Sequence, residues 1–209
     1  GHAYLEDGSR RGQAHYQQLY NYVTLRDINS LKSYQKIERW MDIDNYIDYM
    51  IAELYMGNVD WPQNNILYWR KNTSYKPNAA YGQDGRWRWM INDLDASFGI
   101  SWGTINPDTN SFERLTGDSW KTGKLFTNLL ENDLFKAKFI YRLIELTETI
   151  FEETNVTTQL DAMIDLYEPE MAEHIARYGY PTTYQAWEIY TNRMKTFAAS
   201  RNEYLLSYL

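Results

Sequence analysis

The feature that most constrains the fold is a run of apolar residues between positions 43 and 55 whose spacing fits a helix. Its members recur three and four residues apart: Ile43, Tyr46, Ile47, Met50, Ile51, Leu54 and Tyr55. This spacing puts them on one wide face, so the sequence predicts an amphipathic helix packed against a core. Asp42 stands where an N-cap is expected, and Gly57 stands where a left-handed residue commonly ends a helix.

The helical period covers two zones of the chain and is lost between them. The first zone runs from Gly12 to about Tyr55, and the second follows a polar connection that ends at Gly123. In the second zone we expect helices at roughly 124–131, 132–153, 158–178 and 182–208. Pro169 should interrupt the third of these helices, because proline cannot donate a backbone hydrogen bond.

The zone from Asn58 to Gly103 is predicted to be the β part of the fold. Two short runs rich in β-branched and aromatic residues, 66–70 and 87–91, flank a polar stretch of Asn, Ser, Gly and Pro. They predict a hairpin with a long loop. The fold class is therefore α+β, mainly helical with a small β-hairpin, in a single domain over residues 1–209.

Composition excludes several classes of protein. The chain has 209 residues, no Cys and a net charge of −7. It therefore forms no disulfides or thiolate metal sites, and its acidity disfavours nucleic acid as a partner. No apolar run approaches the roughly 20 residues that cross a bilayer, so we expect no membrane span in this chain.

The polar residues best suited to chemistry lie at the two ends of the predicted hairpin. The first group is the run from Asn58 to Asn65, which precedes the first strand, and the second is the run from Asn92 to Gly99, which follows the second strand. Hairpin closure should bring the two groups together. In the first group, Asp60 and Asn65 have the spacing of the kinase catalytic loop, where an Asp meets the acceptor hydroxyl and an Asn holds Mg²⁺.

Carboxylate and amide oxygens are ligands that suit Mg²⁺, and phosphoryl transfer depends mainly on positioning and charge neutralisation. The sequence therefore predicts a catalytic role for Asp60 and a metal site formed by Asn65, Asp93 and Asp95. The chain contains no glycine-rich phosphate loop and no strand lysine of the Val-Ala-Ile-Lys type. It accordingly offers only one half of a kinase site.

These motifs together resemble the CotH kinase family, whose members are similar to the spore coat protein CotH, an atypical protein kinase. The resemblance is carried by residues 42–47, 58–65, 85–89 and 93–99, and by the later segments 125–130 and 201–204. It covers most of the chain. The two acidic motifs are specific as a pair, whereas either alone would be weak.

The resemblance implies a secreted or cell-surface kinase that uses Mg²⁺ and ATP to phosphorylate a protein acceptor, with a fold like the C-terminal lobe of protein kinases. Asp60 matches the catalytic Asp of the family, Asn65 its metal-side amide and Asp93 its metal-binding acid, with Asp95 as a second acid. Family members also have an upstream lobe with a nucleotide-gripping Lys. We expect that lobe to be absent from these residues, and the 209 residues to be inactive alone.

The same residues also have structural explanations, which the sequence leaves open. Asp60 can simply cap a turn, and Asn64-Asn65 can form an Asx-turn that enters the strand. A buried Arg can compensate Asp93 and Asp95 as well as Mg²⁺ can. The tryptophans near the hairpin are more often core residues than stacking platforms. The alternative function is a non-catalytic secreted module that binds carbohydrate or protein through an aromatic-rich face.

Overall fold

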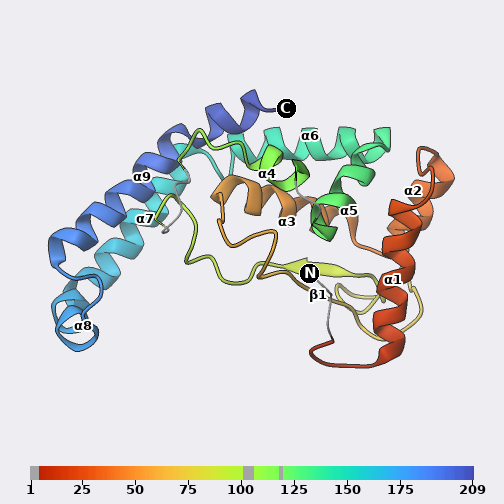
Figure 1. Ribbon diagram of the computed structural model, residues 1–209, viewed down its shortest axis with the longest axis horizontal. Helices are drawn as coiled ribbons and strands as arrows, with labels where there is room; N and C mark the ends of the chain where they lie inside the picture. The colour runs from red at the N-terminus through yellow and green to blue at the C-terminus, as the bar shows by residue number, and fades with distance from the viewer. Residues whose placement is uncertain (1–4, 101–105, 118–119) are drawn as a thin grey trace. The chain divides into compact units, whose positions relative to one another are not determined.

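The computed structural model describes residues 5–100, 106–117 and 120–209 (Figure 1). In chain order its elements are α1 (Arg10–Thr24), α2 (Leu31–Glu38), α3 (Ile43–Met56), β1 (Leu67–Trp69), β2 (Arg88–Met90), α4 (Ser111–Gly117), α5 (Lys121–Leu130), α6 (Asp133–Glu148), α7 (Glu153–Tyr167), the 3₁₀ turn η1 (Glu168–Glu170), α8 (Met171–Tyr178) and α9 (Tyr184–Ser207). The predicted combination of many helices with one small antiparallel sheet is confirmed.

The chain forms two compact units, each assembled from three segments. The first unit comprises Gly1–Glu53, Asp60–Asp93 and Phe112–Arg142, and the second comprises Leu54–Val59, Leu94–Ser111 and Leu143–Leu209. The first unit therefore contains the hairpin and most of α3. The second unit contains the last turn of α3 and the helices α7, α8 and α9.

Helix α3 is the central core element of the first unit, as its apolar period predicts. Tyr46 and Met50 are completely buried, and the Tyr46 N–H donates to the carbonyl of Asp42, which directly precedes the helix. Gly57 has a φ of 60°, the left-handed conformation predicted at the end of this helix. Both predicted boundary positions are therefore confirmed.

The hairpin is shorter than predicted but lies within both predicted runs. β1 and β2 are antiparallel, with the pairs Leu67↔Met90, Tyr68↔Trp89 and Trp69↔Arg88. The Asn45 side chain on α3 holds the other edge of β2: its amide nitrogen donates to the Trp89 carbonyl at 3.1 Å, and its oxygen accepts from the Trp89 N–H at 2.7 Å. The Asn45 side chain thus makes hydrogen bonds of the kind that a third strand would make with β2.

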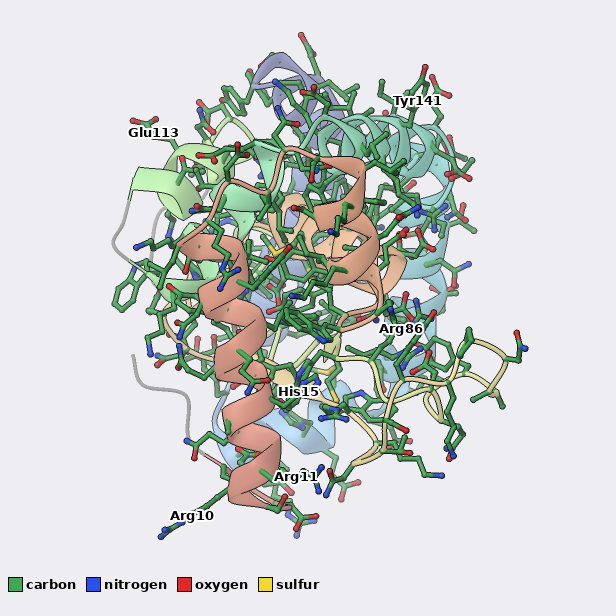
Figure 2. All side chains as sticks on the ribbon, turned by 90° about the vertical axis from the view of Figure 1, so that its right-hand side faces the viewer. Arg10, Arg11, His15, Arg86, Glu113 and Tyr141 are labelled. Atoms are coloured by element: carbon green, nitrogen blue, oxygen red, sulfur yellow. The ribbon has the colours of Figure 1, made fainter. Side chains whose placement is uncertain are left out.

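Aromatic packing attaches α1 to the hairpin. The rings of Tyr16 and Tyr68 stack at 4.1 Å, and the Trp87 indole N–H donates to Nδ1 of His15 at 3.0 Å. Figure 2 shows His15 on the side of α1 that faces the rest of the protein, whereas Arg10 projects away from it. His15 is therefore part of the interface between α1 and the hairpin.

A buried ionic network fixes the long loop between the strands. Arg88, with 1% of its side chain exposed, binds both carboxylate oxygens of Asp84 at 2.8 and 2.7 Å and one oxygen of Asp42 at 2.7 Å. Arg86 adds contacts to Asp42 at 3.2 Å and to Asp84 at 2.7 Å. The network joins the end of the loop to the start of α3, and therefore aligns the hairpin with that helix.

The later helices differ from the prediction mainly at their ends. The interruption predicted at Pro169 is confirmed by η1, which separates α7 from α8. However, α6 ends at Glu148 instead of 153, and α7 begins at Glu153 instead of 158. The Glu152 side chain caps α7 by accepting the N–H of Asn155 at 2.9 Å, a local hydrogen bond that apolar periodicity does not reveal.

Helix α4 was not predicted, since the segment from Gly103 to Gly123 reads as a polar connection. It has seven residues, and Leu115 is its one completely buried side chain. So short a helix offers too few apolar residues to establish a period.

Arg201 joins separate segments of the second unit through hydrogen bonds to backbone carbonyls. Its side chain is completely buried, and it donates to the carbonyls of Leu54 at 2.5 Å and Tyr55 at 2.9 Å, in the last turn of α3. It also binds the carbonyls of Pro107 and Thr109. A guanidinium at the C-terminal end of a helix satisfies carbonyls that have no partner within the helix.

Within the described ranges, no helix has both the length and the apolar character needed to cross a bilayer.

Candidate functional site

The loop that precedes β1 is built around Asp60. Its two carboxylate oxygens accept one hydrogen bond each, from the side-chain amides of Asn64 and Asn65, both at 3.0 Å. The Asn64 N–H also donates to the Asp60 carbonyl at 3.0 Å. The structure thus brings Asp60 and Asn65 together, and it also forms the local turn that the sequence allowed.

Two neighbouring contacts hold this loop in place. Trp61 is buried with 3% exposed, and its indole N–H donates to the Tyr49 hydroxyl on α3 at 2.8 Å. Burial raises the pKa of Tyr49, so this hydroxyl stays protonated at neutral pH. Arg114 donates to the Gln63 side chain at 3.2 Å. The carboxylate of Asp60 therefore extends from a loop that is anchored on both sides.

Asn65 and Asp93 share an uncommon backbone conformation. Asn65 has a φ of 59° and Asp93 a φ of 54°, both in the left-handed region. Among the described non-glycine residues, Phe98, with a φ of 52°, is the one other example. Such conformations are most accessible to Asn and Asp, and strained residues concentrate at functional sites.

Asn64, Asn65 and Asp93 lie at the same end of the hairpin. The last residue pair of the hairpin at this end is Leu67↔Met90. Asn64 lies three residues before Leu67, and Asp93 lies three residues after Met90. Both polar groups therefore extend from one end of the small sheet, as hairpin closure requires.

Asp95 belongs to a different segment from Asp93. β2 ends at Met90, and Asp93 is the last residue of one segment of the first unit, whereas Leu94–Ser111 belongs to the second unit. The segment after Leu94 is attached to the end of α3 by two backbone hydrogen bonds, from Val59 to Ala96 and from Phe98 to Met56, both at 2.9 Å. The two neighbouring acids are therefore held by separate frameworks.

The donor atoms are compatible with Mg²⁺, although they do not form an all-protein cage. In the part of the chain that the structure describes, no three His, Asp or Glu side chains come together as a metal site. Mg²⁺ commonly takes one or two carboxylates, completing its octahedron with water and phosphate oxygens. Because the amide nitrogen of Asn65 faces Asp60, its amide oxygen is the atom that remains for a cation.

The aromatic residues around the hairpin are mostly core residues. Trp61, Trp87 and Trp89 have 3%, 7% and 3% of their surface exposed, and Trp69 has 40%. Trp102 lies outside the described residues. The burial of these rings does not favour an aromatic binding face near the hairpin.

Sequence reasoning missed the residues that support the site. Asn45 aligns β2, and the network of Asp42, Asp84 and Arg88 fixes the loop. The sequence did contain a signal for this network. Arg86 and Arg88 alternate with tryptophans in a predicted strand, and a charged residue that becomes buried in a strand needs a charged partner such as Asp84. The sequence does not reveal the role of Asn45, since its two partners are backbone atoms 44 positions away.

Comparisons with known proteins agree on one family. A family model described as CotH kinase protein matches residues 4–205. Invasin CotH3 of Rhizopus delemar is 22% identical over 156 residues, which cover 73% of this chain and 24% of that protein. Invasin CotH2 of the same organism is 22% identical over 138 residues, 64% of this chain and 22% of that protein. The matches thus span about a quarter of the length of these curated relatives. No solved structure matches the chain.

Proposed function

The chain belongs to the CotH kinase protein family, and from this premise we propose that it carries the acceptor-side and metal-side residues of a kinase that uses Mg²⁺ and ATP. The fold would correspond to the C-terminal lobe of protein kinases. The reaction would transfer the γ-phosphoryl group of ATP to a hydroxyl group of a protein acceptor. Residues 1–209 would act as one C-terminal part of the kinase domain.

In this proposal Asp60 orients the acceptor hydroxyl and takes its proton. At the same time the bond from the acceptor oxygen to phosphorus forms, and the bond from phosphorus to the β,γ-bridging oxygen breaks. Asn65 and Asp93 hold Mg²⁺ through oxygen atoms, with Asp95 in support. The metal, when bound, neutralises charge on the transferring phosphoryl group. The amides of Asn64 and Asn65 keep the Asp60 carboxylate oriented until the acceptor arrives.

The observation that carries the proposal is the convergence of site residues and unusual backbone. Asn65 and Asp93, assigned to the metal from the sequence, are two of the three described non-glycine residues with a left-handed backbone. They extend from one end of the hairpin, and Asn65 contacts a carboxylate that two amides orient. A hairpin end that served only as a turn would more commonly use Gly at such positions.

Secretion or display at the cell surface is part of the proposal. Its support is that the two relatives from Rhizopus delemar are named invasins. Detection of the protein outside the cytoplasm in fractionated cells is the direct measurement.

The test is phosphoryl transfer by the complete protein with Mg²⁺ and ATP, measured for wild type, Asp60→Asn and Asp93→Asn. We expect both substitutions to lower the rate constant by at least about 100-fold. Asp93→Asn should also raise the Mg²⁺ concentration needed for half-maximal rate. Asp44→Asn is the matched control, because Asp44 is exposed and pairs with Lys138 at the surface. Equal rates in all four proteins would refute the assignment.

A further inference from the structure

The net charge of the protein is concentrated in one stretch of sequence. Residues 151–190 contain eight Asp and Glu residues and one Arg, a balance of −7. The whole chain has 28 acidic and 21 basic residues, so the remaining positions hold twenty of each and are neutral overall. These forty residues form α7, η1, α8 and the first turns of α9. We refer to them as the acidic arm.

The helices of the acidic arm bury few of their side chains. α7 has fifteen residues and none of them is buried, and Met171 is the one buried residue of α8. Figure 1 shows α7 and α9 side by side, with α8 at the end of the pair. An amphipathic helix gains most of its stability by burying one face. α7 packs on α9, where Lys195 pairs with Asp161, but this contact buries none of its side chains, so much of the surface of α7 remains exposed.

The uncovered surface of the arm is apolar as well as acidic. Six large side chains on it are 38–69% exposed: Met163, Leu166, Tyr167, Tyr178, Tyr180 and Tyr184. Two of them come from neighbouring parts of the arm, because the Tyr184 hydroxyl donates to Glu168, which directly follows Tyr167. Large apolar side chains gathered in this way mark an interaction surface more often than a solvated one.

Charge decides between the possible occupants of this surface. A second copy of the chain would bring its own seven negative charges against the same patch in a symmetric dimer, which is unfavourable. Anionic lipid headgroups and nucleic acids are repelled for the same reason. A basic polypeptide with apolar side chains complements both properties of the surface, and a helix can complete a bundle with α7 and α9.

We propose that the acidic arm is a docking surface for a basic amphipathic helix of a partner protein. Leucine-like side chains of the partner would pack on Leu166 and Tyr178, and its Lys and Arg residues would face Glu170 and Glu173. The inference does not depend on the proposed phosphoryl transfer, since it uses none of the residues of that site.

The experiment measures binding of the complete protein to three labelled peptides by fluorescence anisotropy. The probe is a leucine–lysine peptide of about 20 residues with leucines at helical spacing. One comparison peptide has the same composition with leucines out of register, and the other has glutamate in place of lysine. We expect the probe to bind at least about tenfold more tightly than either comparison peptide, with affinity that falls as salt rises.

Surface variants locate the binding. Leu166→Ser combined with Tyr178→Ser should lower the affinity for the probe peptide by about tenfold. Glu170→Gln with Glu173→Gln should lower that affinity by about threefold and reduce its dependence on salt. Leu25→Ser is the matched apolar control, because Leu25 is as exposed as Leu166, at 69%. Glu131→Gln with Glu203→Gln is the matched charge control.

Three results would overturn the proposal. The first is equal binding of the lysine and glutamate peptides, and the second is an equal loss of affinity in the Leu25 control. The third is a dimer in sedimentation velocity that the Leu166 and Tyr178 substitutions dissociate, because the occupant would then be a second copy of the chain.

Discussion

Asp84 stabilises the first unit through charge. The hydrogen bonds from Arg88 are the main reason that the pKa of Asp84 lies far below its usual value of 3.8. A carboxyl group whose pKa is depressed by folding stabilises the folded state above its unfolded pKa, and this contribution is lost as the pH falls. The network is therefore a source of acid sensitivity.

For Asp84→Asn we expect a loss of about 3 kcal/mol in the free energy of unfolding at neutral pH, because Arg88 keeps its charge while losing its bidentate partner. Stability of the wild type should decline as the pH falls below 3.8, and the variant should decline less steeply. Urea unfolding at several pH values measures both effects. Asp44→Asn should change stability by less than about 1 kcal/mol, because its ion pair is at the surface. An unchanged acid profile in Asp84→Asn would contradict this account.

Asn65 allows the backbone and side-chain contributions to be separated. Asn65→Gly keeps access to a φ of 59° but removes the amide, whereas Asn65→Ala removes the amide and adds strain of about 1 kcal/mol. We therefore expect both variants to lose phosphoryl transfer, and only the Ala variant to lose stability as well. Thermal unfolding and kinase assays of the complete protein check this. Full activity in Asn65→Gly would remove Asn65 from the proposed metal site.

At the scale of elements, two helical glycines should respond in opposite ways to the same substitution. Gly123 in α5 approaches α4 so closely that a Cβ atom would lie 2.0 Å from the Leu115 carbonyl oxygen. Gly12 in α1 has no atom within 4 Å of such a Cβ among the described residues. The first glycine permits two helices to approach each other, and the second has no packing role.

We therefore expect Gly123→Ala to destabilise the protein by about 2 kcal/mol or more, since the backbone of α4 must move. Gly12→Ala should stabilise it by about 0.5–1 kcal/mol, because alanine loses less conformational entropy in a helix. Chemical denaturation followed by circular dichroism measures both. A neutral Gly123→Ala would show that α4 and α5 separate readily.

At the scale of the whole molecule, Arg201 joins α9 to two other segments of the second unit, the end of α3 and residues 107–111. Burial lowers its pKa to about 10, so the guanidinium remains charged at neutral pH. Arg201→Met would leave four carbonyl groups and the Ser111 hydroxyl without their donor. We expect a loss of about 3–5 kcal/mol in the free energy of unfolding. Arg193→Met, at an exposed position of the same helix, should have little effect, and equal stability of the two variants would contradict the role of Arg201.

The parts of the fold that depend on local spacing were predictable. The helix from Ile43 to Met56 is identified by its apolar period, its end by Gly57, and the break between α7 and α8 by Pro169. The pairing of Asp60 with Asn65 was also accessible, since five residues in a turn can be closed by their own side chains. Helix α4 and the boundary at residues 149–152 were not, because they depend on burial and on a single capping carboxylate.

The sequence by itself determined the helical class, the hairpin and the residue types that could bind a cation at its end, because these follow from periodicity and from neighbours along the chain. Only the tertiary structure decided which charged and polar residues pair across distant segments. Asp42 and Asp84 are bound to a buried Arg88, and Asn45 aligns β2, through contacts between distant segments. Such contacts depend on how elements pack in three dimensions, and a pattern along one chain does not encode the distance between them.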